Sequence, residues 1–563
     1  MLKRSIHFLN VYKYSIITLV LITFYAYYDV WHTFFFADDW NLLGSYPLLK
    51  NFGLSYFFQL FGMPFGSHFV PIGIVLVTVE TYLFGIHTTG YAIVSLLLHC
   101  INILLVFYSI LQITNKRAST AWLGAAFFAV NYSIHEGVGI FLLASNIFVE
   151  MCTMFVLIGL LQFLKFYHDR NNLRAFFISF LFFLCAVFLK EDGFMLLPVI
   201  VLFLTGIFLE EKKKKYLVYS GLYCIVIIAY LLLRVKVLHP LNHLIVTASG
   251  AHFWPLLLWN LFTLPPKVIT DIILPQEWLM AFSGLIAGNI YSDISLAQNI
   301  LFKTVLLYDQ LSIFFGVIIF LIMLLLYSKI HSVKKGQRFG ILLYGTSSVC
   351  VPLVLLTLNQ NMYWIFSRYL YLPAALLSIF LFSCFSLLPF FRRAYRAWFA
   401  TCLCLILICI YAFFNHTFFV AYAKSGSYRK HMLEDISYHL NFTKKQEIVF
   451  IKTSTGGFHN TNDIFGFGTS FGRALLIWNW FQGDNKQKIP PCLYDPLFFF
   501  TSPVNDYKQC DGKGYGYFQD IDKLRKAVKQ YTINPKAIDA FAYNQATNTF
   551  TMINPEIQSE LTR

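Results

Sequence analysis

The sequence has 563 residues, of which 58% are hydrophobic and only 13% are charged, and its mean hydropathy is +0.62. This composition excludes an ordinary soluble globular protein and predicts a polytopic α-helical membrane protein. The net charge of +15 would suit a nucleic-acid partner, but the basic residues gather in short loops between apolar runs, which is typical of membrane topology. We therefore expect membrane lipids, and no nucleic acid, as partners.

The first apolar run, at about residues 14–36, is long enough to span a bilayer and ends just before Asp38 and Asp39. It is longer than the apolar region of a signal peptide and no small-residue cleavage site follows it, so we expect a retained anchor. Three Lys or Arg residues precede it, and short cytoplasmic segments carry the excess of such residues. The N-terminus is therefore predicted to be cytoplasmic, and the acidic pair to lie at the opposite, extracytoplasmic or lumenal, surface.

The apolar runs predict about eleven spans in total, and each short cytoplasmic loop between them is basic. The spans lie at residues 14–36, 88–113, 118–131, 139–167, 173–189, 194–209, 216–233, 311–327, 339–358, 371–391 and 398–414. Two stretches interrupted by proline, at residues 37–87 and 234–310, predict interfacial helices within extracytoplasmic loops. In the second stretch, re-entrant helices or two additional spans would leave the later loops on the same sides, and these alternatives stay open.

Residues 1–414 thus form a predicted multi-pass membrane domain, and the more polar residues 415–563 a small soluble α/β domain. The odd number of spans places this C-terminal domain outside the cytoplasm, on the side of the acidic pair. In it, residues 447–452 predict a strand, residues 520–530 an amphipathic helix and residues 537–553 a hairpin.

Cysteine use agrees with an extracytoplasmic C-terminal domain. Of the 11 Cys residues, only Cys492 and Cys510 lie in the polar part of the chain, and the others fall in apolar runs, where a free thiol acts as a small hydrophobe. A disulfide between these two would stabilise the domain by about 3 kcal/mol in an oxidising compartment. The sequence leaves both a disulfide and two free thiols open.

Ionisable residues collect at the extracytoplasmic ends of the predicted spans, and the inner loops hold no comparable set. Taken singly, each can equally be a solvated loop residue, a contact to lipid headgroups or half of an ion pair. Together they predict a polar site close against the membrane surface. They are Asp38, Asp39, His68, His135, Glu136, Lys190, Glu191, Asp192 and Arg368.

Five short motifs follow one another along residues 1–414. They are Asp38-Asp39-Trp40 after the first span, Leu98-His99-Cys100-Ile101-Asn102 within the next, His135-Glu136-Gly137-Val138, Lys190-Glu191-Asp192-Gly193 and Arg368-Tyr369-Leu370-Tyr371-Leu372-Pro373. Their order and topological side resemble the GT-C superfamily of integral-membrane glycosyltransferases, and within it the protein O-mannosyltransferase-like and aminoarabinose-transferase-like branch. The C-terminal domain resembles no known family and differs from the tetratricopeptide repeats that end some related enzymes.

The resemblance implies a glycosyltransferase that moves a sugar from a polyprenyl-phosphate donor to an acceptor hydroxyl, with inversion at the anomeric carbon. It leaves open the acceptor (a protein, lipid or polysaccharide) and the membrane (a bacterial plasma membrane or the endoplasmic reticulum). Because phosphate is a good leaving group, the reaction needs a base for the acceptor's proton rather than an acid. By the family pattern Asp38 is that base and Asp39 orients the acceptor or nearby basic groups, with the reverse assignment left open.

The same resemblance implies the substrate contacts. Arg368 and Lys190 would neutralise the departing phosphate, because fixed cations stabilise a developing anion. Glu136 would contact the sugar or pair with His135. The remaining predicted substrate-binding residues are Glu191, Tyr369 and Tyr371. The sequence shows no Cys/His metal spacing, and a divalent cation is left open as a cofactor because some relatives use one.

Two other functions stay open. A transporter or flippase for a lipid-linked saccharide would show charged or helix-breaking residues near mid-membrane and internal repeats, and neither is clear in the sequence. A non-catalytic scaffold would account for the C-terminal domain but not for the ionisable residues at the extracytoplasmic ends.

Overall fold

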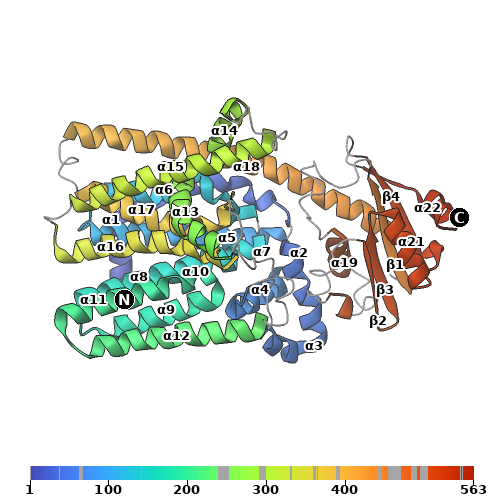
Figure 1. The fold of residues 1–563 in the computed structure, drawn as a ribbon, viewed down its shortest axis with the longest axis horizontal. Coiled ribbons are helices and arrows are strands. Elements are labelled where there is room, and N and C mark those ends of the chain that lie inside the picture. Colours follow the sequence, from blue (N-terminus) through green and yellow to red (C-terminus); the bar gives the residue numbers. More distant parts are fainter. Residues whose placement is uncertain are drawn as a thin grey trace.

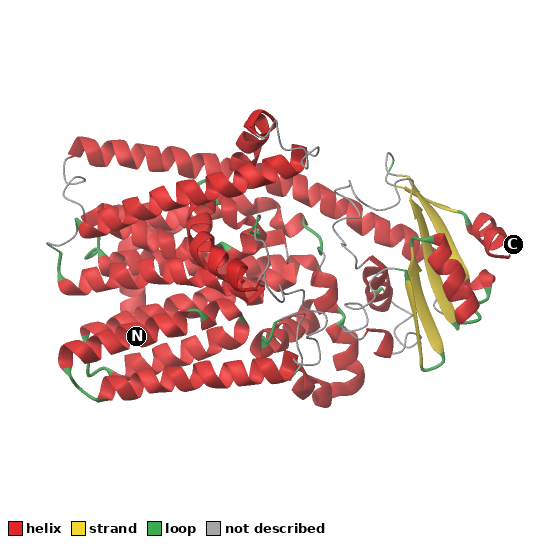
Figure 2. Ribbon diagram, in the orientation of Figure 1, coloured by secondary structure: helices red, strands yellow, loops and turns green. Residues whose placement is uncertain are grey.

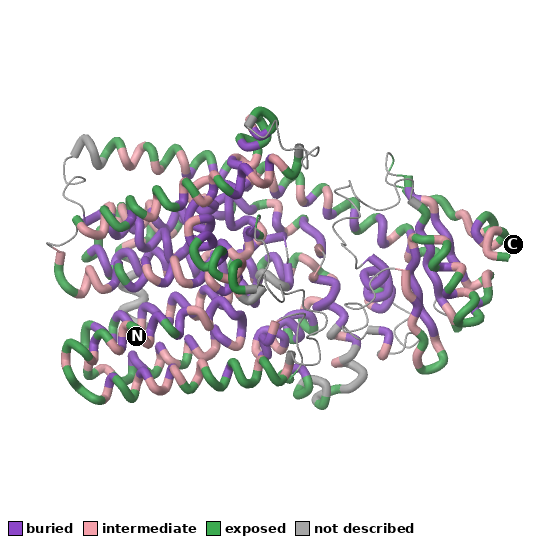
Figure 3. The backbone as a smooth tube through the Cα atoms, in the orientation of Figure 1, coloured by how far each residue is buried: buried purple, intermediate pink, exposed green. Residues whose placement is uncertain are grey.

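The computed structural model describes residues 2–562 except 37, 63–67, 141, 239–252, 291–299, 330–332, 359–362, 364, 388–393, 441–444, 454–470, 483–490, 495–504, 545–546 and 548. A helical bundle forms most of the molecule, and a five-stranded sheet lies at one end of it (Figure 1). Of the described residues, only those of this C-terminal part form strands (Figure 2). Buried residues run through the middle of the bundle and along the sheet (Figure 3).

The helices from the N-terminus to the beginning of the C-terminal part follow one another with short connections. They are α1 (Leu2–Tyr27), α2 (Asp38–Leu43), α3 (Ser45–Leu60), α4 (Pro71–Phe84), α5 (Thr88–Ile113), α6 (Ala118–Ala129), α7 (Leu142–Ala144), α8 (Cys152–His168), α9 (Leu173–Leu189), α10 (Glu191–Phe194), α11 (Leu196–Glu211), α12 (Lys215–Leu238), α13 (Phe253–Ile273), α14 (Gln276–Ile290), α15 (Ile300–Ser328), α16 (Lys335–Cys350), α17 (Tyr371–Leu387) and α18 (Ala394–His439).

Among the described residues, nine helical runs are long and apolar enough to cross a membrane, and four further apolar helices are shorter. The long runs are Val11–His32, Thr88–Ile113, Asn146–His168, Glu191–Glu211, Lys215–Val237, Trp254–Ile273, Leu301–Ser328, Lys335–Leu356 and Trp398–His439. The chain is thus a multi-pass helical membrane protein, as predicted. Eight of the eleven expected spans correspond to long runs and three to the shorter helices α6, α9 and α17. The number of crossings and their sidedness stay predictions.

The loops that carry the excess of Lys and Arg lie together at one end of the bundle. Arg170, after α8, forms an ion pair of 3.8 Å with Glu211 at the end of α11. Lys335, at the start of α16, pairs with Glu210. This end lies opposite the sheet, on the left in Figure 1, whereas the short helices α2, α3, α4 and α7 lie at the end nearer the sheet. The clustering is what the predicted cytoplasmic loops require.

The stretch 234–310, expected to hold interfacial or re-entrant helices, contains α13, whose Trp254–Ile273 run has the length and composition of a span. Pro265 and Pro266 lie inside this helix without ending it. Membrane helices tolerate internal proline because neighbouring groups satisfy the carbonyls that it frees. Prolines that predict helix ends in the sequence are therefore helix-internal here, and α13 packs against α15.

The expected domain boundary at residues 414 and 415 falls inside one continuous helix. α18 has 46 residues and ends only at His439. At about 1.5 Å per residue it is roughly 69 Å long, more than twice the hydrocarbon thickness of a bilayer. The change from apolar to polar residues near position 414 therefore marks where α18 leaves the predicted membrane region, and not where the helix ends.

The sheet is mixed, with strand order β2-β3-β1-β4-β5. β1 pairs in parallel with β3 and β4, and the edge strands β2 and β5 pair antiparallel with their neighbours. The elements of this part are β1 (Gln446–Thr453), α19 (Phe471–Phe481), β2 (Asp506–Cys510), β3 (Lys513–Phe518), α21 (Ile521–Gln530), β4 (Ile538–Asn544), β5 (Thr549–Met552) and α22 (Asn554–Thr562). The predicted strand, amphipathic helix and hairpin are confirmed as β1, α21 and β4–β5; β2 and β3 were not predicted.

Both faces of the sheet are covered. Because side chains alternate along a strand, Ile448 and Phe450 of β1 pack with Leu524 of α21 on one face. Val449 and Ile451 face the other way and join the core that continues through α19 into the bundle. Figure 1 shows α21 and α22 on the outer side of the sheet and α19 between the sheet and the bundle. The C-terminal part is therefore packed onto the membrane part.

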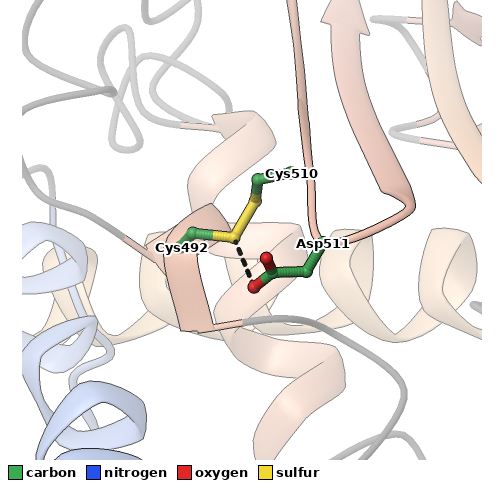
Figure 4. Close-up of a disulfide and its surroundings, with 3 residues drawn as sticks. All are labelled: Cys492, Cys510 and Asp511. Carbon is green, nitrogen blue, oxygen red and sulfur yellow. Dashed lines mark hydrogen bonds between the residues drawn. A yellow bond between two sulfur atoms is a disulfide. The ribbon is translucent and has the colours of Figure 1, made fainter.

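Cys492 and Cys510 form a disulfide, one of the two alternatives that the sequence left open (Figure 4). It ties the short helical turn Pro491–Tyr494 to the end of β2. The same turn packs against α3, so the disulfide also links the sheet to a helix of the membrane part.

We expect replacement of both Cys492 and Cys510 by serine to lower the free energy of unfolding of the C-terminal part. Closing a loop with a sequence separation of 18 restricts the unfolded chain, and the expected loss is about 3 kcal/mol. Limited proteolysis of the full chain in detergent at rising urea concentration measures the change. Cys409→Ser, at an exposed free cysteine of α18, is the matched control. Equal midpoints for the double variant and the parent chain would contradict a stabilising disulfide.

Candidate functional site

Asp39 lies inside the protein and its carboxylate is occupied by backbone amides. Its side chain is fully buried, and it accepts hydrogen bonds from the N–H groups of Phe36 (3.1 Å), Leu142 (3.1 Å) and Leu143 (3.0 Å). Charge-assisted bonds of this kind are stronger than neutral ones. Asp39 therefore attaches the first turn of α2 to α7, which is a structural task rather than contact with an acceptor.

Asp38, the neighbouring residue, has the opposite environment. It begins α2, and 43% of its side chain is exposed. Its Oδ2 atom lies 3.6 Å from Nη1 of Arg368. Of the two adjacent carboxylates, the geometry therefore favours Asp38 as the one that can reach a substrate.

Arg368 lies in the short helical turn Ser367–Tyr369, just before α17. Its backbone N–H donates to Oε2 of Glu136 at 3.2 Å, so Glu136 fixes the turn that presents the guanidinium group. The guanidinium carbon lies 5.7 Å from the ring centre of Tyr369. Asp38, Glu136, Arg368 and Tyr369, four of the predicted site residues, are thus neighbours at the end of the bundle nearer the sheet.

Lys190 approaches the other side of this group. Its Nζ atom lies 4.7 Å from the ring centre of Tyr369 and 2.9 Å from Oδ2 of Asp192. Burial would lower the pKa of Lys190, but the Asp192 carboxylate opposes this effect and the pKa is raised above its ordinary value. Tyr369 therefore lies beside two permanent cations, Lys190 and Arg368.

Glu191 belongs to a separate cluster. Its carboxylate lies 2.7 Å from Nη1 of Arg234 and 3.1 Å from Nδ1 of His68, and it accepts the N–H of Phe69 at 3.3 Å. These partners hold the segment before α4 against the end of α12. Glu191 therefore organises the surrounding loops, whereas its sequence neighbour Lys190 faces the Asp38 group.

Tyr371 is enclosed in the core instead of lining a surface site. It is fully buried, donates its hydroxyl to Nδ1 of His99 at 2.7 Å and accepts from Nδ2 of Asn102 at 3.2 Å. Nε2 of His99 lies 3.0 Å from the carbonyl of Ala129, which assigns the ring proton to Nε2. Tyr371 thus holds α17 to α5, and a direct contact with substrate is not available to it in this arrangement.

Sequence reasoning missed two buried acids. Glu80 of α4 and Glu150 at the start of the Asn146–His168 run are 5% and 0% exposed. Nδ2 of Asn146 donates to Oε1 of Glu80 at 3.0 Å, and Glu80 lies within electrostatic range of Asp39. A single acidic residue within an apolar run was the available signal. Within the described ranges, no group of three or more His, Cys, Asp or Glu residues is arranged to hold a metal ion.

We expect Asp39→Asn to destabilise the protein by about 3 kcal/mol, because one acceptor of a buried charge-assisted network becomes a donor that faces backbone N–H groups. Asp38→Asn is the matched control, and its half-exposed side chain should change stability by less than about 0.5 kcal/mol. Thermal unfolding of the purified chain in detergent compares the two variants. Equal melting temperatures for both would contradict the structural role of Asp39.

A comparison with models of known protein families finds no match for this chain, and a search of curated proteins finds no significantly similar sequence. The resemblance to membrane glycosyltransferases therefore depends on the order and placement of the residues described above. The function has to be argued from the site itself.

Proposed function

We propose that the chain is a membrane glycosyltransferase that moves a sugar from a polyprenyl-phosphate donor to an acceptor hydroxyl at the extracytoplasmic or lumenal membrane face. The observation that carries the proposal is the half-exposed carboxylate of Asp38, 3.6 Å from Arg368 and at the same end of the bundle as Lys190. A base beside fixed cations is what transfer from a sugar phosphate requires.

In the proposed reaction, Asp38 takes the proton of the acceptor hydroxyl as its oxygen bonds to the anomeric carbon. The bond between that carbon and the phosphate oxygen breaks, and its electron pair leaves with the phosphate. Attack from the face opposite the leaving group inverts the anomeric carbon. The nearby guanidinium of Arg368 favours the ionised, basic form of Asp38.

The departing phosphate gains negative charge, and two cations are near enough to share it. Arg368 offers a planar fork of donors that suits phosphate, and Lys190 offers a compact charge. Tyr369 lies between them and its ring contacts both. Asp192 keeps Lys190 charged and in place before a donor arrives.

The helices around the site suit a lipid-linked donor. α3 and α4 expose large apolar side chains, among them Phe58 (69% exposed) on α3 and Leu83 (67% exposed) on α4. Apolar residues on short helices at the end of a bundle are typical of the membrane interface. A polyprenyl chain would lie in the bilayer beside these helices, with its phosphate directed toward Arg368 and Lys190.

A transporter or flippase is the second candidate, because a buried ion pair joins Lys267 of α13 to Asp309 of α15 (3% and 7% exposed). Ionisable residues inside a membrane domain often mark a transport path. Lys267 lies only six residues before the end of α13, Ile273, whose carbonyl accepts the hydroxyl of Tyr411. The pair thus lies toward one end of the bundle, which favours a structural ion pair over a mid-membrane site.

We expect Asp38→Asn to abolish transfer and to leave the donor unused. Mass spectrometry of glycans on lipids, proteins and envelope polysaccharide would compare cells with the parent chain, no chain and the variant. A sugar missing from the acceptor in both test strains, with polyprenyl-phosphate sugar accumulating, supports the transferase and identifies the acceptor. Full glycan transfer by Asp38→Asn would exclude Asp38 as the base and favour transport.

The proposed topology places the N-terminus in the cytoplasm and the C-terminal part outside it, at a bacterial plasma membrane or the endoplasmic reticulum. We expect Lys536→Cys, on the exposed surface of the C-terminal part, to react with a membrane-impermeant maleimide in intact right-side-out vesicles. Lys213→Cys, in the basic loop between α11 and α12, should react only after permeabilisation. The parent chain gives the background, and labelling of Lys213→Cys in sealed vesicles would overturn the orientation.

A further inference from the structure

The helix that carries Asp38 is too short to hold its own position. α2 has only six residues, and a helix of that length is unstable without external contacts. The bonds from Asp39 to the amides of Leu142 and Leu143 hold its first turn. Its last turn needs partners for the carbonyl groups that no longer have a helical donor.

Those partners come from the C-terminal part of the chain. Arg473, near the start of α19, is fully buried. Its Nη2 donates to the carbonyl oxygen of Asn41 at 3.0 Å, and its Nε donates to that of Trp40 at 3.3 Å. A guanidinium group at the end of a helix satisfies the final carbonyls in this way. α2 is therefore held at one end by the bundle and at the other by α19.

The contact between α19 and α2 is tight. Gly44 directly follows α2, and a Cβ atom at this position would meet the guanidinium group of Arg473. Phe34, which lies before α2, packs edge-on against Trp478 of α19 with ring centres 5.9 Å apart. The space between α2 and α19 thus admits only glycine at position 44 without movement of the arginine.

α19 is in turn fixed by the sheet and by α18. The hydroxyl of Tyr515, on β3, donates to the carbonyl of Gly472 at 2.6 Å. Nδ2 of Asn479 donates to Oγ of Ser437 in α18 at 3.1 Å. The position of Arg473 therefore depends on the folded C-terminal part, and not on α19 alone.

α18 holds the segment that leads into α2. Arg429 is almost fully buried, and its Nη2 donates to the carbonyl of Phe34 at 3.3 Å. Its guanidinium carbon lies 5.5 Å from the ring centre of Phe36 and 5.0 Å from that of Tyr422. Two buried arginines from beyond the predicted membrane region therefore contact the chain on either side of Asp38.

We propose that the C-terminal part acts as a positioning domain for Asp38, with Arg473 as the positioning residue that holds α2 in its working orientation. This inference depends on the proposed function, in which Asp38 is the base. Small displacements of a reacting group are costly, and a shift of 1 Å can lower a rate by about 100-fold. Release of the last turn of α2 would therefore lower transfer without changing any group that contacts the donor.

Arg473→Met tests the proposal, because methionine keeps most of the side-chain length and removes the donors. Hydrogen exchange of the peptide that contains α2 should become about 10-fold faster, as expected when two hydrogen bonds at a buried helix end are lost. Sugar transfer in cells should fall by about 100-fold, with the lipid-linked sugar accumulating. Arg473→Lys, which keeps one donor, should recover part of both. Arg525→Met is the matched control, since Arg525 lies on α21 and pairs with Asp522 and Glu560.

Gly44→Ala tests the same contact from the other side and decides the question if Arg473→Met fails to fold. It displaces the arginine and leaves every polar group present, so the same rise in exchange and loss of transfer are expected. Unchanged exchange in α2 would overturn the proposed contact. Faster exchange with full transfer would overturn the positioning role. Full transfer by Asp38→Asn together with faster exchange in Arg473→Met would instead overturn the proposed function and leave the contact standing.

Discussion

The carboxylate of Asp39, buried and bonded to three backbone amides, is the interaction on which the arrangement at this end of the protein depends. It joins α2 to α7 across more than 100 residues of chain and places the adjacent Asp38 at the surface. A buried carboxylate is tolerated only when its oxygens are satisfied, and here the backbone supplies the donors. The structural and the exposed acid are thus separated by a single peptide bond.

The polar groups around Asp38 divide into those that face it and those that support them. Arg368, Tyr369 and Lys190 lie in contact with one another near Asp38. Glu136 and Asp192 hold the two cations by a backbone hydrogen bond and an ion pair. A site of charged groups at the end of an apolar bundle keeps its geometry only when each charge has such a second partner. This division supports a site prepared for an anionic substrate.

The C-terminal part contributes to the same end of the molecule. Its sheet buries one face against α21 and α22 and the other against the core shared with the bundle. α19 extends from that shared core to the carbonyls of α2, and α18 crosses from the bundle to the sheet as one helix. A part of the chain that the sequence describes as a separate polar domain is therefore continuous with the membrane part in its packing.

Hydropathy and short-range periodicity are local properties, and they determined the membrane class, the helical bundle, most of the apolar helices, the strand β1 and the hairpin β4–β5. They also identified the group of ionisable residues from which the site is built. The tertiary structure alone decided which of Asp38 and Asp39 is buried and that Tyr369 faces two cations while Tyr371 lies in the core. It alone brought Arg473 to α2 from more than 400 positions away in the sequence. Burial and long-range contact arise from packing between distant segments, and a local pattern of residues does not contain that information.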